Sequence, residues 1–420
     1  MNLIVICSDY PVVKGNAEAS LLKFQLNSIS KVFKRIILLP KAKVKKKDIL
    51  SGSEHTIIFN LRTFRFSSIF DFINNFHFLV NDLKKISLSK VAIPSLLRSI
   101  EVYSKSIFLF TFLKNYFKKN NLKDNTAIYS FWFDDTTLGA LLLKRKYPDL
   151  KIFTGAHGHD LFPDRQIGNR IPFRELSINL IDKVLVCSNE GIEYLTNEYP
   201  KFKQKIKLLN SGIIKKDFKV KSSDDQKFRI LTLSRTDPVK RISYLLKQLK
   251  RIEEISKFEI EYFHIGGDNV PGETSLQDLI DFSKDLNFKK FNINFLGKIS
   301  DDDLNKFFRQ SSIDVFLNVS SSEGTCLSLV EAMSYSIPVI VTKVGGNITI
   351  GNYLNTGLRV NFDFKDLYEY FENIYYNKSY REQLKFNSHK YWSKYHDSKV
   401  LSNEIENIFK SICKPTSNSI

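Results

Sequence analysis

Cysteine is scarce in this 420-residue chain, and long apolar runs are missing from it. The four cysteines are widely spaced and form no Cys-x-x-Cys pair, so neither a zinc site nor a disulfide framework is indicated. No apolar run reaches the roughly 20 residues that span a bilayer. The amino terminus, MNLIVICSDYP, lacks the charged leader and cleavage site of a signal peptide and has the pattern of a first β-strand. We therefore expect a cytoplasmic protein with reduced thiols.

Acidic residues are too few to balance the basic ones. The chain has 45 Asp and Glu against 63 Lys and Arg, which gives a net charge of +18 and a pI of about 9.4. Such a balance suits either nucleic acid or an anionic membrane surface as a partner. The RRM, KH and zinc-finger signatures of nucleic-acid-binding domains are absent from the sequence, so a basic nucleic-acid-binding protein is the less favoured interpretation.

Apolar strand-like segments alternate with longer amphipathic blocks, which is typical of parallel βαβ units and an α/β fold. A chain of this length favours two domains rather than one core. The polar, charged stretch 215–227 suits the linker between a first domain at 1–214 and a second at 228–395. Strands are predicted at 3–9, 35–40, 56–61, 126–133, 151–156, 183–187 and 206–210, and then near 228–234, 258–265, 291–296, 313–319, 337–342 and 357–361. The tail from about 364 is predicted to be helical, and the last seven residues to be disordered.

Two glutamates eight residues apart mark the stretch 322–342, SEGTCLSLVEAMSYSIPVIVT. Glu323 follows a predicted buried strand, at the edge where open α/β sheets bind ligands. Glu331 falls in the first turns of the next helix, roughly 12 Å away at helical rise. That distance suits the span from the hexose to the ribose of a nucleotide sugar whose diphosphate lies at the helix amino end. A loop acid beside a solvated helix glutamate explains the spacing alone equally well.

Two cations flank a proline-containing turn about ninety residues earlier. Arg235 and Lys240 follow the predicted strand FRILTLS, again at a carboxyl end. Arginine offers a planar fork to phosphate oxygens and lysine a point charge, so the two could converge on one dianion. The alternative is a solvated basic loop.

These motifs together resemble glycosyltransferase family 4. The matching patterns are R-x4-K, S-x-x-E-G-x6-E-A-M-S and P-V-I-V-T-x-V-G-G, and the segment TGAHGHD at 154–160 is similar to the family's A-H-G-x-D segment. The resemblance implies a GT-B fold: two Rossmann-like domains that face each other across a cleft, with a last helix near 396–413 crossing back to the first. It also implies retaining transfer of a sugar from a nucleotide-diphosphate donor to a saccharide or polyprenyl-linked acceptor, without a metal or other cofactor. The implied setting is the synthesis of a cell-surface polysaccharide such as capsule, O-antigen or exopolysaccharide.

The resemblance also assigns roles to individual residues. It implies catalytic roles for His157, Glu323, Arg235 and Lys240, and an acceptor-side role for Asp160. The implied donor-binding residues are Gly15, Asn16, Arg235, Lys240, Gly266, Ile299, Glu323, Gly324, Thr325, Cys326, Leu327 and Glu331. The pair Asp134–Asp135 is predicted to cap a helix rather than to bind a metal. A GT-B enzyme that is not a transferase, such as a nucleotide-sugar epimerase, is the alternative.

Residues 61–123 carry much of the basic excess, with eleven Lys and Arg against three acids, a local charge of 11 − 3 = +8. A helix with the five aromatic residues between 108 and 117 on one side, and Lys114, Lys118 and Lys119 on the other, could lie in a membrane interface. That interpretation predicts peripheral attachment to the inner face of the cell membrane. Alternatively, the aromatic residues pack onto the first-domain sheet while the lysines are solvated.

Overall fold

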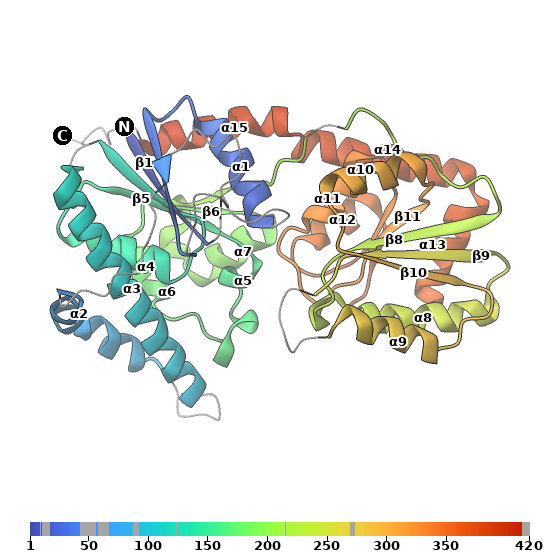
Figure 1. Cartoon of the computed structure of the whole chain (residues 1–420), viewed down its shortest axis with the longest axis horizontal. Helices are drawn as coiled ribbons and strands as arrows, with labels where there is room; N and C mark the ends of the chain where they lie inside the picture. The colour runs from blue at the N-terminus through green and yellow to red at the C-terminus, as the bar shows by residue number, and fades with distance from the viewer. Residues whose placement is uncertain are drawn as a thin grey trace. The chain divides into compact units, whose positions relative to one another are not determined.

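The computed structural model describes residues 1–8, 10, 17–42, 56–57, 67–86, 92–122, 125–214, 216–268 and 274–413. The chain forms two compact units (Figure 1). The first comprises Met1–Asn210 together with the chain from Ser402 onward, and the second comprises Ser211–Leu401. The division therefore falls just before the stretch that the sequence predicts as a linker. The predicted cleft between the two domains stays a prediction.

The first unit contains a parallel sheet of seven strands in the order β3-β2-β1-β4-β5-β6-β7. The strands are β1 (Asn2–Cys7), β2 (Arg35–Pro40), β3 (Thr56–Ile57), β4 (Thr126–Ser130), β5 (Lys151–Ala156), β6 (Lys183–Val186) and β7 (Ile206–Leu208). Each predicted strand of this domain overlaps one of them, although residue 9 of the first and residues 58–61 of the third lie outside the described residues. The near-continuous Ile, Leu and Val runs suit a parallel sheet, because helices cover both of its faces.

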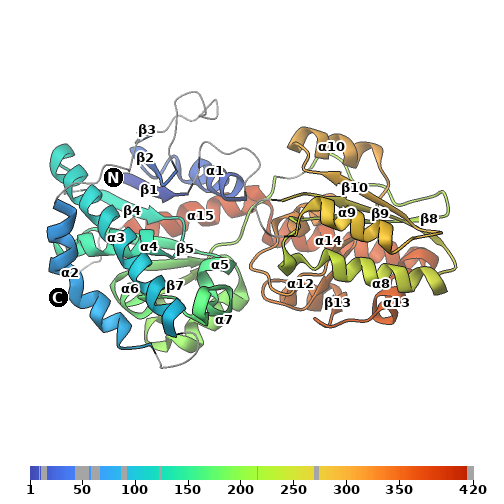
Figure 2. The same cartoon turned by 60° about the horizontal axis from the view of Figure 1, so that its bottom comes forward.

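Helices on the two faces of this sheet divide its core (Figures 1 and 2). Ile128 and Ile152 share a hydrophobic cluster with side chains of α3 and α4, whereas the alternate residues Tyr129 and Phe153 contact Phe409 of α15. The helices are α1 (Ala17–Ile29), α2 (Ser67–Leu83), α3 (Ala92–Asn120), α4 (Asp135–Leu142), α5 (Gly158–Leu161), α6 (Arg174–Leu180), α7 (Asn189–Glu198) and α15 (Ser398–Cys413). The last helix thus returns the chain to the first unit, as predicted. Residues 414–420 lie outside the described residues.

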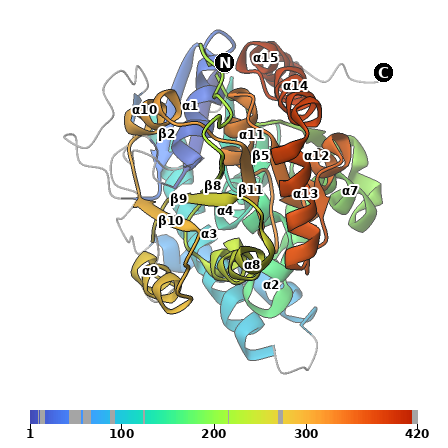
Figure 3. The same cartoon turned by 90° about the vertical axis from the view of Figure 1, so that its right-hand side faces the viewer.

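The second unit contains a parallel sheet of six strands in the order β10-β9-β8-β11-β12-β13. The strands are β8 (Lys227–Leu233), β9 (Glu259–Ile265), β10 (Asn292–Gly297), β11 (Val315–Asn318), β12 (Val339–Thr342) and β13 (Gly357–Leu358), which confirms the predicted set. Helices α8 (Ile242–Ile255), α9 (Leu276–Asp285) and α13 (Phe364–Tyr376) pack on one face. Helices α10 (Asp301–Gln310), α11 (Leu327–Ser334), α12 (Asn347–Leu354) and α14 (Lys378–Tyr395) cover the other (Figure 3).

The predicted membrane face near Lys114 is wrong. Phe110 and Phe117 are buried in the core of the first unit, and Phe112 and Tyr116 pack against that core. The Lys114 ammonium donates a 2.6 Å hydrogen bond to Asp71 of α2 and so is not a free surface cation. The aromatic residues pack inside the unit, which is the alternative that the sequence left open. Within the described part of the chain, no helix has the length and apolarity needed to cross a bilayer.

Candidate functional site

The carboxyl ends of β8 and β11 bring the predicted cations and the first glutamate together in the second unit. These strands are neighbours in the sheet, and the loops that follow them lead into α8 and α11. Lys240 Nζ lies 2.6 Å from Glu323 Oε1. The same carboxylate oxygen accepts hydrogen bonds from Ser320 Oγ at 2.6 Å and Asn318 Nδ2 at 3.1 Å. The sequence thus predicts both charged residues of this cluster, but not that they pair with each other.

The Lys240–Glu323 pair is ionised although it is buried, with the side chains 15% and 7% exposed. Burial alone would raise the pKa of Glu323, but the Lys240 charge and the hydrogen bonds to the carboxylate hold that pKa below its usual value. Burial opposes the charge of Lys240 as well, and the Glu323 carboxylate keeps the pKa of the lysine raised. An ammonium has three N–H donors, and the contact with Glu323 uses one of them. The pair therefore sets a fixed positive group and a fixed carboxylate at the ligand-binding edge of the sheet.

Arg235 lies on the same loop but in a more open place. Its guanidinium pairs with Asp237, and its side chain is 49% exposed. The two cations predicted to converge on one dianion are thus each paired with a different carboxylate. Because the guanidinium carries five N–H donors, it can hold Asp237 and still bind phosphate oxygens.

Glu331 occupies the second turn of α11, as predicted, and pairs with a residue that the sequence does not single out. Lys216 Nζ donates to Glu331 Oε1 at 3.0 Å and lies 4.9 Å from the centre of the Tyr335 ring. Burial opposes the charge of Lys216, but Glu331 keeps the pKa of the lysine raised. No local signal marks Lys216, because it lies in the polar stretch predicted to be a linker. The Glu331 side chain is 25% exposed, so this pair is more open than the first.

Two glycines hold the site loops against each other. Gly266 has φ +134°, and a Cβ there would lie 1.8 Å from the carbonyl oxygen of Ser234, directly before Arg235. Gly345 has φ +45°, and a Cβ would lie 1.8 Å from the carbonyl oxygen of Glu323. Both positions therefore exclude any larger residue. The close backbone approach at Gly266 is toward the loop that carries Arg235.

The remaining predicted donor residues surround the start of α11. Gly324 is buried and Thr325 half-buried in the preceding loop; Cys326 is the N-cap, and Leu327 the first residue of the helix. The Cys326 thiol accepts a 2.9 Å hydrogen bond from Asn318, and burial raises its pKa, so it stays protonated and unreactive. Ile299, after β10, packs against the core on the α11 side of the sheet. Gly15 and Asn16 lie outside the described residues.

His157 and Asp160 follow β5 in the first unit. The His157 ring stacks on Phe131 with centroids 4.5 Å apart and meets Trp132 at 4.9 Å. Its Nδ1 atom is buried, has no hydrogen-bond partner among the described residues, and lies 3.9 Å from Asp160 Oδ2. Asp160 accepts hydrogen bonds from the backbone amides of His157 and Phe133, each at 2.6 Å. Both of its oxygens therefore fix the turns after β4 and β5.

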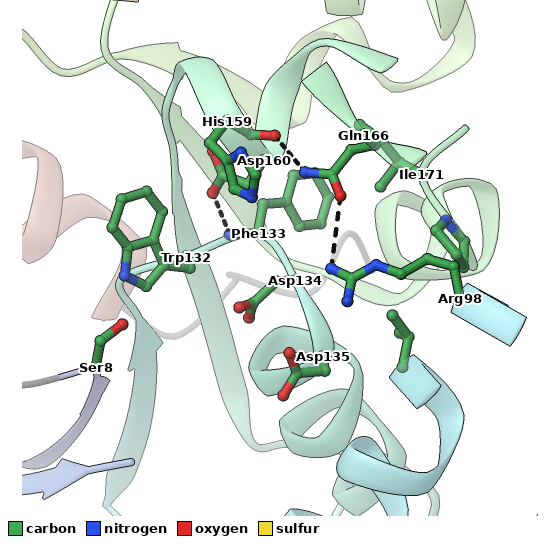
Figure 4. Close-up of a pocket in the computed structure, with 12 residues that line it drawn as sticks. Ser8, Arg98, Trp132, Phe133, Asp134, Asp135, His159, Asp160, Gln166 and Ile171 are labelled. Atoms are coloured by element: carbon green, nitrogen blue, oxygen red, sulfur yellow. Dashed lines mark hydrogen bonds between the residues drawn. The ribbon is translucent and has the colours of Figure 1, made fainter. Parts of the chain in front are cut away.

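A cavity of about 260 Å³ opens beside Asp160, within the first unit (Figure 4). Its lining comes from the ends of β1, β4 and β5, from α3 and from the segment 166–172: Ser8, Arg98, Val102, Trp132, Phe133, Asp134, Asp135, His159, Asp160, Gln166, Ile171 and Pro172. Gln166 links its sides, because it donates to the His159 carbonyl at 2.6 Å and accepts from Arg98 at 3.5 Å. This cavity is absent from the sequence-based prediction, since five separate segments build it.

Two adjacent carboxylates face this cavity. Asp134 caps α4 by accepting from the Thr136 amide at 2.9 Å, which confirms its predicted role. Asp135 is instead a buried residue of the first helical turn, where Lys41 Nζ lies 3.3 Å from it and from Asp134. Burial and the neighbouring Asp134 charge raise the pKa of Asp135 to about 6, although Lys41 opposes the shift. Within the described ranges, no group of three or more His, Cys, Asp or Glu side chains is placed to hold a metal ion.

Comparisons with known proteins agree with this layout. Residues 213–391 match the family model described as glycosyl transferases group 1. Protein CapJ of Staphylococcus aureus is 25% identical over 178 residues, and the match spans 42% of this chain and 43% of CapJ.

Two solved structures share the whole fold. Sucrose-phosphate synthase from Thermosynechococcus elongatus superposes with a TM-score of 0.69 at 15% identity, over 98% of this chain and 99% of that one. HepE from Anabaena, solved in complex with UDP-glucose, superposes with a TM-score of 0.63 at 14% identity, over 97% of this chain and 99% of HepE. The chain therefore has the GT-B fold, and the match to the group 1 glycosyltransferase model lies within its second unit.

Proposed function

We propose that this protein transfers a sugar from a nucleoside-diphosphate carrier to a saccharide or lipid-linked acceptor. The observation that carries the proposal is the buried Lys240–Glu323 pair at the carboxyl ends of β8 and β11. It lies inside the segment that matches the group 1 glycosyltransferase model. HepE, which shares the fold, was solved with UDP-glucose. A nucleotide sugar is therefore the donor class that we assign to the second unit.

In the proposed complex, the donor spans the two ion pairs of the second unit. Arg235 and the free N–H donors of Lys240 bind the diphosphate, and Glu323 holds hydroxyl groups of the transferred sugar. Glu331 accepts hydrogen bonds from the ribose hydroxyls, in exchange for part of its contact with Lys216. This assignment uses each charged group at the sheet edge, and each keeps capacity for a ligand after its contacts within the protein.

The reaction that we assign to this site retains the anomeric configuration. The bond between the anomeric carbon and the diphosphate oxygen breaks, and the acceptor oxygen bonds to that carbon on the same face. The acceptor proton passes to the departing phosphate oxygen. Arg235 and Lys240 stabilise the negative charge that builds on the diphosphate, as preorganised charges do at many sites. We propose that these two side chains supply the charge that a divalent metal would otherwise provide.

The cavity beside Asp160 is the acceptor site that we propose. It combines an aromatic side chain, Trp132, with the carboxylates Asp134 and Asp135 and the cation Arg98. Carboxylates accept hydrogen bonds from sugar hydroxyls, and an aromatic face packs against the apolar face of a sugar ring. We place the enzyme in the cytoplasm, in the synthesis of a cell-surface polysaccharide, the setting that the family resemblance implies.

A donor panel tests this function. UDP- and GDP-sugars are screened by thermal shift, where a true donor at about 100 times its Kd adds roughly 2.7 kcal/mol of stability. Each stabilising donor is then incubated with and without saccharide acceptors, and the products are identified by mass spectrometry and NMR. We expect acceptor-dependent transfer with retention, which persists in excess EDTA. Conversion of the donor to an epimer without any acceptor would instead identify an epimerase, and inversion would refute the stereochemical proposal.

A further inference from the structure

The helix pair α2–α3 presents an unusual outer surface. Half of the sixteen exposed large apolar side chains that the structure describes lie on these two helices. They are Ile69, Phe70, Ile73 and Phe76 on α2, and Ile93, Leu96, Leu97 and Ile100 on α3. In each helix the spacing of three and four residues gathers them into one stripe along the axis. We call these eight side chains the apolar stripe.

The contacts between the two helices include buried polar ones, beside the aromatic contact of Phe72 with Tyr103. Asp71 of α2 accepts hydrogen bonds from Thr111 and Lys114 of α3, at 2.7 and 2.6 Å. Asp82 of α2 accepts a 2.9 Å bond from Ser99 of α3. Both aspartates are buried, whereas Phe70 is 70% exposed. Charged groups inside and phenylalanine outside reverse the usual arrangement of a helix pair that faces water.

The apolar stripe lies on one side of the pair. Asp71 and Lys114 join the start of α2 to the end of α3, and Asp82 and Ser99 join the opposite ends, so the helices run antiparallel. At 3.6 residues per turn, the stripe lies roughly 150° around from the buried side of α2 and roughly 120° from that of α3, in the same rotational sense. Similar rotations in antiparallel helices turn both stripes to the same side of the pair. Figures 1 and 2 place the pair at the outer edge of the first unit.

Basic side chains flank the stripe. The acids within α2 and α3 are Asp71, Asp82 and Glu101. The first two are buried, and the exposed Glu101 pairs with Arg98 at 2.7 Å and with Lys105. The exposed lysines near or on these helices are Lys84, Lys85, Lys105, Lys118 and Lys119, of which Lys85 pairs with Glu175 and Lys105 with Glu101. This surface therefore carries a positive excess around an apolar centre, which is complementary to an anionic lipid bilayer.

We propose that the apolar stripe docks this protein onto an anionic bilayer, with its side chains inserted at the level of the lipid headgroups. Docking does not depend on the proposed transferase activity. If the protein has the proposed transferase activity, docking would favour a lipid-linked acceptor; this consequence rests on the proposed function. Arg98 and Val102 line the acceptor cavity, and Arg98 directly follows Leu97 of the stripe. The cavity would then lie about one helix diameter, roughly 10 Å, from the headgroups.

Vesicle flotation tests the docking surface. The full-length protein is floated with vesicles of equal parts phosphatidylglycerol and phosphatidylcholine. The variant Phe70→Ser/Ile73→Ser/Leu97→Ser removes three of the four most exposed members of the stripe, two on α2 and one on α3. We expect at least about 100-fold weaker partitioning, since each buried apolar side chain contributes strongly to insertion. The matched control, Ile214→Ser/Phe386→Ser/Val400→Ser, removes three equally exposed side chains of the second unit and should float like the wild type.

A charge variant separates the electrostatic contribution to vesicle binding from the apolar contribution. Lys84→Glu/Lys118→Glu/Lys119→Glu should lower flotation several-fold at low salt and much less at high salt, because salt screens the attraction. Equal flotation of the stripe variant and the wild type would overturn the proposal, as would a wild type that does not float. A third outcome would also overturn it: a wild-type dimer that the stripe variant converts to monomer, without vesicle binding. Donor-binding measurements on the same variants stay unaffected if docking fails but the proposed function is correct.

Discussion

The two units differ in how many chain segments supply the polar side chains at the edge of each sheet. In the second unit, two lysine–glutamate pairs, Lys240–Glu323 and Lys216–Glu331, form between segments that are far apart in the chain. Both glutamates belong to the motif of two glutamates eight residues apart. In the first unit, the cavity gathers side chains from five segments, and two of the carboxylates that line it, Asp134 and Asp135, pair with Lys41. The difference teaches that a linear motif marks a site when one loop–helix junction supplies most of its chemistry. A site assembled from many segments leaves no such mark.

The largest effect should come from breaking the Lys240–Glu323 pair. Lys240→Met leaves the Glu323 carboxylate buried and unpaired, and Glu323→Gln does the same to the lysine. Each single variant should lose about 3–5 kcal/mol of unfolding free energy and about 100-fold or more in kcat/KM. The double variant should regain most of the stability but none of the activity. Chemical denaturation and steady-state kinetics measure the two quantities, and recovery of activity in the double variant would show a purely structural pair.

Arg235 should matter for activity and little for stability. Its side chain is half exposed, so Arg235→Ala should change the unfolding free energy by about 0.5 kcal/mol or less. The loss of a charge contact with the departing diphosphate should lower kcat/KM at least about tenfold. Arg359→Ala is the control, because Arg359 is a more exposed arginine of the same unit, paired with Asp366. Equal kinetics for the two variants would remove Arg235 from the donor site.

Asp135 offers a smaller, pH-dependent test in the first unit. Its folded pKa of about 6 lies above the ordinary value of 3.8, so the folded state binds more protons between these values. The Asp135 charge therefore costs stability as pH rises through that window. Asp135→Asn should have the same Tm as the wild type near pH 4 and should be more stable by about 2 kcal/mol above pH 7. A Tm difference that does not change with pH would contradict this electrostatic account.

Sequence patterns predict most of the fold. The apolar runs mark every strand that the structure describes, because a buried parallel strand needs a nearly continuous run of such residues. The sequence pattern predicts the wrong surroundings for the aromatic residues of α3. Phe110 and Phe117 suit a membrane interface and a protein core equally well, and tertiary packing decides between them.

The site is predicted only in part. Glu323, Glu331, Arg235 and Lys240 follow from their motifs, since each follows a strand at the same edge of the sheet. Lys216 and Lys41 do not, because a lysine in a polar stretch has no distinguishing pattern. Their ion-pair partners are carboxylates about a hundred residues away in the chain.

Binding of a nucleoside diphosphate tests the central claim most directly. UDP and GDP are titrated calorimetrically into the wild type, Glu331→Ala and Asp134→Asn. Asparagine keeps the helix cap at position 134, so that variant perturbs the first-unit cavity without unfolding α4. One of the two nucleotides should bind the wild type and Asp134→Asn with equal affinity. It should bind Glu331→Ala at least about tenfold more weakly, because a hydrogen bond to a charged group contributes about 1.5–3 kcal/mol. Failure of both nucleotides to bind, or a loss confined to Asp134→Asn, would contradict a donor site in the second unit.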